Sequence, residues 1–156
     1  MKAHGPLVRG PVLILAFLSL AMGGMWYMAL RQSPPVFVDF LADIGFAGWL
    51  AAFRQTFASF RESIPDVLLY SMPNALWSFS YTLIMMDIWW RDTSRARFFW
   101  LATIPVVVFG WEGLQYSRLA PGTGCFEDLI FSLLGLAAGF FMIVYWKRRI
   151  YAKEDH

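Results

Sequence analysis

Carboxylate and amide side chains flank a short turn between two long apolar stretches of the chain. Glu112 and Gln115 precede this turn, and Glu127 and Asp128 follow it. Ionisable groups at membrane depth are costly and therefore need a partner or a function. Glu112 and Gln115 share one helix face because they are three residues apart, and a short connection makes successive helices antiparallel neighbours. We therefore predict an outward-facing polar pocket that binds a ligand, formed by Glu112, Gln115, Arg118, Glu127 and Asp128.

An architectural interpretation of the same residues stays open. Glu127 and Asp128 would then begin a helix, where carboxylates cap free amides and complement the positive end of the helix dipole. Glu112 and Gln115 would face the head-group layer, and the glycines of the turn would serve its conformation. In the ligand-binding interpretation, Arg118 is available for an anionic group.

The composition indicates an integral membrane protein. Hydrophobic residues make up 58% of the 156 residues, charged residues make up 15%, and the mean hydropathy is +0.51. These values argue against a soluble domain. The length suits about four spanning helices of roughly 20 residues each, so we predict a single membrane domain over residues 1–156. The balanced charge, with a net value of +2, argues against nucleic acid as a partner.

Few residues suit a cofactor or a catalytic pair. Cys125 is the single cysteine, and His4 and His156 are the two histidines. An internal disulfide, a cysteine-based zinc site and a bis-histidine haem site in a span are therefore excluded. A Ser/His or Cys/His pair cannot be placed in a span either. We predict no catalytic residues, no metal site and no cofactor.

Four apolar stretches have the length of membrane spans. They cover residues of about 11–30, 73–90, 98–116 and 126–146. The first could also be a signal peptide, but its apolar run is longer than a typical signal core. We therefore predict an all-α fold, a polytopic bundle of four transmembrane helices.

The segment at about 36–62 has a different pattern. Its apolar residues recur mostly at spacings of three or four, with Asp39, Asp43 and Arg54 at other positions. We predict an amphipathic helix in the extracytoplasmic interface, because a span would bury all three charges. Pro34-Pro35 should break the chain before it, and Ser63-Ile64-Pro65-Asp66 should end it and start a new helix. A re-entrant or spanning version stays open.

Positive charges indicate that both termini are cytoplasmic. With this orientation the inside segments hold Lys2, Arg9, Arg91, Arg95, Arg97, Lys147, Arg148, Arg149 and Lys153, and the outside segments hold Arg31, Arg54, Arg61 and Arg118. Cytoplasmic loops are the richer in Lys and Arg. On the cytoplasmic side, we expect Asp87 to reach the interface or to pair with an arginine such as Arg91 or Arg95.

Small residues form a stripe along the last apolar stretch. Asp128, Ser132, Gly135 and Gly139 are separated by four, three and four residues, which places them on one helix face. Gly135 and Gly139 also form a small-xxx-small pattern that lets another helix approach closely. We predict that Ser132, Gly135 and Gly139 pack against a neighbouring helix.

The same residues resemble a family signature. The pattern Glu112-x-x-Gln115, a short loop and then Asp128-x-x-x-Ser132-x-x-Gly135-x-x-x-Gly139 resembles that of VanZ-like bacterial membrane proteins. Gly122-Thr123 and the tract Pro73-Asn74-Ala75-Leu76-Trp77 are similar to further parts of it, so the resemblance covers residues 63–146. It implies a multi-pass, four-helix protein of the bacterial inner membrane. One family member is linked to glycopeptide (teicoplanin) resistance.

Three hypotheses about function follow. The leading one is a non-enzymatic VanZ-like protein that binds an envelope lipid or a cell-wall precursor at its outer face. The second is a membrane hydrolase or transferase in which Glu112 acts as base and Asp128 positions a lipid head group or a divalent cation such as Mg²⁺ or Ca²⁺. The third is an accessory subunit that docks on another membrane protein through Gly135 and Gly139. The expected partners are membrane lipids and, in the third case, a larger membrane complex.

Overall fold

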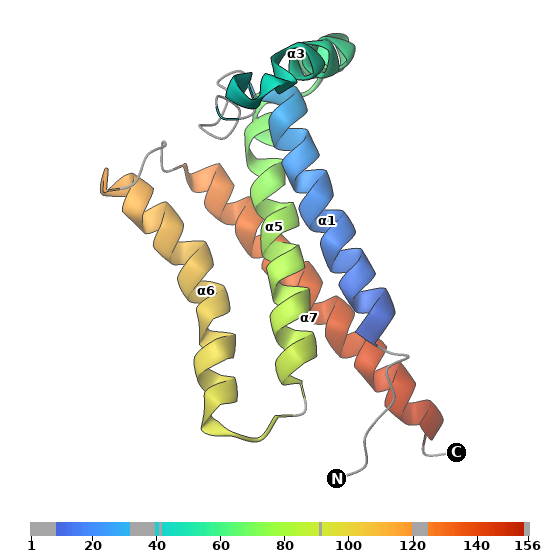
Figure 1. The fold of residues 1–156 in the computed structure, drawn as a ribbon. Helices are drawn as coiled ribbons and strands as arrows, with labels where there is room; N and C mark the ends of the chain where they lie inside the picture. Colours follow the sequence, from blue (N-terminus) through green and yellow to red (C-terminus); the bar gives the residue numbers. More distant parts are fainter. Residues whose placement is uncertain (1–8, 32–39, 41, 91, 120–124, 155–156) are drawn as a thin grey trace.

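The protein is a bundle of four long helices crossed at one end by short ones (Figure 1). The computed structural model describes residues 9–31, 40, 42–90, 92–119 and 125–154. The long helices are α1 (Arg9–Leu30), α5 (Asp66–Trp89), α6 (Arg95–Tyr116) and α7 (Phe126–Glu154). The short ones are the π-helical turn η2 (Ala42–Phe46), α3 (Ala47–Thr56) and α4 (Ala58–Ser63). Every regular element in these residues is helical, which confirms the predicted all-α class.

The central helix is α5, which packs along α1 and α7 (Figure 1). The fourth long helix, α6, lies to one side and contacts α5 and α7 much less. We call the end of the bundle where α1 begins and α7 ends the lower end, and the opposite end the upper end, as they appear in Figure 1. The upper end therefore brings together the end of α1, the start of α5, the end of α6 and the start of α7.

Three of the long helices are long and apolar enough to cross a membrane: Gly10–Leu30, Arg95–Tyr116 and Phe126–Arg149. The 24-residue helix α5 is long enough but is not among the helices that meet the apolar criterion for a span. Several of its polar residues are buried, namely Ser71, Ser78, Ser80, Thr82 and Asp87. The Ser80 hydroxyl donates to the Ala16 carbonyl of α1 over 2.8 Å. The structure therefore has three candidate spans, whereas the sequence analysis predicted four. That α5 also crosses the membrane stays a prediction.

The start of α5 differs from the predicted start of the second apolar stretch. The helix begins at Asp66, so Pro73 lies inside it. Proline has no N–H to donate to the carbonyl four residues back, which is that of Leu69. The Trp26 indole of α1 donates to this carbonyl instead, over 3.3 Å. A contact from a neighbouring helix therefore satisfies the carbonyl that Pro73 leaves unpaired.

The amphipathic segment lies across the upper end (Figure 1). Leu50 is buried, and Phe53 and Phe57 pack on the cluster formed by Ala29, Leu30 and Leu69. Other apolar side chains of the segment, Ile44, Phe46, Trp49 and Phe60, are largely exposed. The predicted break at 63–66 is confirmed, since α4 ends at Ser63 and α5 begins at Asp66. Pro34, Pro35 and Asp39 lie outside the described residues.

The stripe on α7 lies against α5. Ser132, Gly135 and Gly139 are buried. A methyl group built on Gly135 would overlap the Ala75 carbonyl of α5, and one on Gly139 would lie 3.0 Å from the Phe79 carbonyl oxygen. The small residues thus allow the two helix backbones to approach closely.

Candidate functional site

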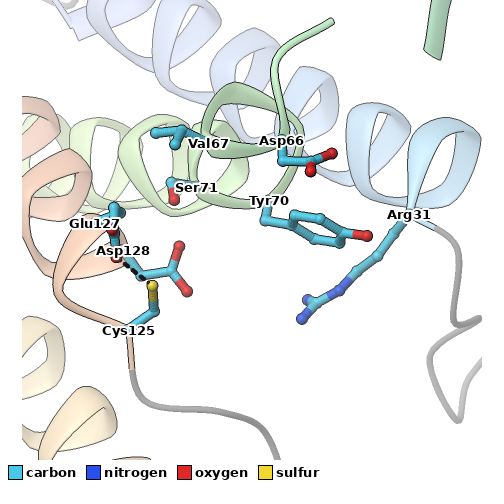
Figure 2. Close-up of a pocket in the computed structure, with 8 residues that line it drawn as sticks. All are labelled: Arg31, Asp66, Val67, Tyr70, Ser71, Cys125, Glu127 and Asp128. Atoms are coloured by element: carbon cyan, nitrogen blue, oxygen red, sulfur yellow. Dashed lines mark hydrogen bonds between the residues drawn. The ribbon is translucent and has the colours of Figure 1, made fainter. Parts of the chain in front are cut away.

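A pocket of about 400 Å³ opens at the upper end between α1, α5 and α7 (Figure 2). It is lined by Arg31, Asp66, Val67, Tyr70, Ser71, Cys125, Glu127 and Asp128. Among the described residues, the lining holds one cation and three carboxylates, so it is strongly charged although it adjoins apolar helices.

Helix ends position these side chains. Arg31 directly follows the last residue of α1, Asp66 is the first residue of α5, and Cys125 directly precedes α7. The starts of α5 and α7 expose backbone N–H groups and the positive ends of two helix dipoles. This local field favours the carboxylates of Asp66, Glu127 and Asp128, which all lie in a first helical turn.

Arg31 is held by aromatic rings. Its guanidinium carbon lies 4.5 Å from the ring centroid of Tyr27 and 5.9 Å from that of Tyr70. Such cation–π contacts orient a guanidinium without neutralising it. The Arg31 carbonyl also accepts a hydrogen bond from the Arg54 side chain of α3, which ties the amphipathic segment to this corner of the pocket.

Asp128 lines the pocket and also lies near Glu112 of α6. Its Oδ1 atom is shielded from solvent and has no hydrogen-bond partner in the described part of the chain, and the same is true of Glu112 Oε2 on α6. Glu112 lies close enough to Asp128 for the two charges to repel, and within reach of the Cys125 backbone N–H. Two like charges are therefore held near each other at the junction of α6 and α7.

The thiol of Cys125 is not an activated nucleophile. It donates a hydrogen bond to Glu127 Oε2. This hydrogen bond, followed by burial, raises the pKa of Cys125 above its usual value. The thiolate is the reactive form of cysteine, so a raised pKa keeps the side chain protonated and unreactive at neutral pH.

The structure brings together part of the predicted site. Glu127 and Asp128 line the pocket, and Glu112 adjoins Asp128 from the α6 side. Gln115 is half-buried on α6 but does not line the pocket. Arg118 is exposed and also lies outside the lining, so the cation of the pocket is Arg31. Gly122 and Gly124 lie outside the described residues.

Sequence reasoning missed the contributions of α1 and α5. Arg31, Asp66, Tyr70 and Ser71 come from segments far from the Glu112–Asp128 motif in sequence. The available signal was that Arg31 ends one apolar stretch and Asp66 begins the next helix. The pairing of these helix ends with α7 depends on tertiary packing that spacing alone does not encode.

A second charged pair lies at the lower end. Asp87 of α5 and Lys147 of α7 form an ion pair, with side chains only 2% and 7% exposed respectively. The expectation that Asp87 would pair with an arginine such as Arg95 is therefore wrong, and Arg91 lies outside the described residues. Lys147 is the partner because α5 and α7 pack along each other, which brings residues sixty positions apart into contact.

Neither the metal-binding side chains nor the comparisons with known proteins assign a function to the pocket. In the described ranges, no three His, Cys, Asp or Glu side chains are grouped so that they could hold a metal ion. Comparison of the chain with protein-family models, curated proteins and solved structures gave no match.

Proposed function

We propose that this chain is a VanZ-like protein of the bacterial inner membrane that binds an envelope lipid or a cell-wall precursor in the pocket at its upper end. The observation that carries this proposal is the position of the pocket. Two candidate spans end beside it, at Leu30 and at Phe126, and charged side chains line it. A polar pocket at the end of apolar spans is placed at the depth of lipid head groups.

We also propose that α5 is a fourth span and that the upper end faces outward. Support comes from the length of α5 and from its course beside the three candidate spans (Figure 1). The excess of Lys and Arg in segments of the lower end favours a cytoplasmic position for that end and for both termini. In a Cys125→Ser background, an impermeant thiol reagent should label Ser117→Cys in intact cells. Labelling of Ser94→Cys instead would contradict this orientation.

Binding fits the site better than catalysis does. Glu112, the base of the hydrolase hypothesis, does not line the pocket, and the Cys125 thiol has a raised pKa. The accessory-subunit hypothesis loses its docking motif, because Gly135 and Gly139 are covered by α5 of the same chain.

Native mass spectrometry of the purified full chain tests the proposal. The wild type should retain phospholipid or precursor from the envelope. Asp128→Asn and Arg31→Gln should lose most of it, because each removes a charge from the pocket. Asp43→Asn, which changes an exposed carboxylate of the amphipathic segment, is the matched control and should retain lipid. Equal retention by all four proteins would contradict the proposal.

A further inference from the structure

We infer that the pocket selects a lipid whose head group carries both a phosphate and a primary ammonium, as phosphoethanolamine does. This inference rests on the proposed lipid-binding function and names the chemical class of the ligand. Three features of the pocket carry it: the separation of its charges, the carboxylates of its wall, which can only accept hydrogen bonds, and the apolar surface beside it.

The charges of the pocket are separated across its walls. Figure 2 shows the Arg31 guanidinium, just after the end of α1, pointing into the space whose opposite side is formed by Cys125 and by Glu127 and Asp128 of α7. Asp66 adds a carboxylate from α5. A phosphate can accept hydrogen bonds from Arg31 in the two-pronged geometry that guanidinium favours. A positive group on the same ligand then faces the carboxylates.

The charge balance disfavours head groups of a single sign. With one cation and three carboxylates, the described part of the lining carries excess negative charge, so an anionic head group without an amine meets net repulsion. A ligand carrying positive charge alone would leave Arg31 unmatched. A zwitterion satisfies both signs.

A primary ammonium fits better than a quaternary one. The carboxylates of Asp66, Glu127 and Asp128 in the lining can only accept hydrogen bonds when they are ionised. Such an acceptor gains most from an N–H donor, which a primary ammonium supplies and a trimethylammonium lacks. The ring of Tyr70, which could otherwise attract a quaternary ammonium, already faces Arg31.

Apolar side chains beside the pocket favour a lipid over a free zwitterion. Val67 and Leu68 at the start of α5 are 46% and 39% exposed. Phe126 and Ile130 at the start of α7 are 72% and 39% exposed. Acyl chains attached to a head group in the pocket can lie along these side chains, whereas a soluble head group gains nothing from them. The volume of about 400 Å³ is in the range of small-ligand sites.

The test is competitive binding to the purified full chain in detergent, followed by native mass spectrometry. The probes are phosphatidylethanolamine, phosphatidylcholine and phosphatidylglycerol with identical acyl chains, and soluble glycerophosphoethanolamine. We expect phosphatidylethanolamine to bind about tenfold more tightly than the other two lipids, as one hydrogen-bonded charge contributes. Glycerophosphoethanolamine should compete poorly.

Two variants report on the two halves of the head group. Asp128→Asn should remove the preference for ethanolamine over choline, and Arg31→Gln should weaken all three lipids. Glu127→Gln, a change at a more exposed position, gives a second test of the carboxylate wall should Asp128→Asn fold poorly. Arg118→Gln is the control, because this exposed arginine lies outside the lining.

The outcomes separate this inference from the proposed function. Binding of all three lipids with equal affinity, reduced by Arg31→Gln, would overturn the selectivity and leave the lipid-binding function intact. Binding that neither Asp128→Asn nor Arg31→Gln changes would overturn both. Competition by glycerophosphoethanolamine as strong as that of phosphatidylethanolamine would overturn the choice of a lipid as the source.

Discussion

The two ends of the bundle treat charge in opposite ways. At the lower end, Asp87 and Lys147 are buried together and neutralise each other. At the upper end, Glu112 and Asp128 bear the same charge, lie close together, and each has a shielded oxygen atom without a partner in the described residues. Both ends place carboxylates where apolar helices meet, but among the described residues only the lower end pairs its carboxylate with a cation.

The difference separates a structural role from a binding role. A paired charge can be accommodated inside an apolar bundle, whereas an unsatisfied charge lowers the stability of the fold. Residues that lower stability are common where function needs them. The comparison supports a structural role for the lower pair, which holds α5 against α7, and is consistent with the proposed ligand-binding role of the upper carboxylates.

Breaking the lower pair should have the largest effect. Asp87→Leu or Lys147→Met alone leaves one buried charge uncompensated and should lower the free energy of unfolding by about 3–5 kcal/mol. The double variant should recover most of this loss. The measurement is unfolding of the protein in detergent micelles, with exposed Arg148→Met as control. A double variant as unstable as either single one would show that the pair has no mutual role.

Adding side-chain volume at the contact between α5 and α7 should have the next largest effect. Gly135→Ala places a methyl group against the Ala75 carbonyl and should cost about 1–3 kcal/mol through overpacking. Gly139→Ala should cost less, because its nearest contact is 3.0 Å away. The control is Gly113→Ala on α6, which has open space and should gain up to about 1 kcal/mol of helix stability. Equal unfolding midpoints for Gly135→Ala and Gly113→Ala would rule out the close approach.

Removing the upper like-charge contact should stabilise the protein. Glu112→Gln keeps the side-chain shape, relieves the repulsion from Asp128, and removes a negative charge near the negative end of the α6 dipole. We expect a gain of up to about 1 kcal/mol in the same unfolding assay. Exposed Glu62→Gln on α4 should change nothing measurable. A loss of stability in Glu112→Gln would mean that its carboxylate has a stabilising partner.

A carboxylate in the connection between α5 and α6 should have the smallest effect. Asp92, in the connection before α6, accepts a hydrogen bond from the Ser94 backbone N–H over 2.6 Å. Hydrogen bonds from Ser94 lower the pKa of Asp92 below its usual value of 3.8. Its contribution to stability is therefore present above the unfolded-state pKa and is lost as the pH falls through the folded-state pKa. Asp92→Ala should differ slightly from the wild type at pH 7 and not at all at the acid end, as measured by unfolding at each pH. A difference that grows on acidification would contradict this.

Local pattern predicted most of the elements, and tertiary contact decided the rest. Apolar length and spacing located three spans, and the proline-containing break before Asp66 was visible in the sequence. The sequence did not reveal that Pro73 lies inside α5, because a proline is tolerated there only through the hydrogen bond from Trp26 of another helix.

The same limit applies to the charged residues. The motif at 112–128 pointed to Glu127 and Asp128, which share one helix start. Arg31 and Lys147 could not be assigned to their sites, because each meets its neighbours only through the packing of helices distant in sequence.

The most direct test of the central claim is a crossed stability measurement with and without ligand. The unfolding midpoints of the wild type, Lys147→Met and Asp128→Asn are compared in detergent alone and with a bacterial polar-lipid extract. We expect Lys147→Met to be less stable in detergent but to gain the full lipid-dependent shift, which is about 2.7 kcal/mol at a hundredfold excess over Kd. Asp128→Asn, which relieves the same repulsion as Glu112→Gln, should be at least as stable as the wild type in detergent and should lose the shift. A full shift in Asp128→Asn, or its loss in Lys147→Met alone, would contradict the assignment of the upper carboxylates to a ligand.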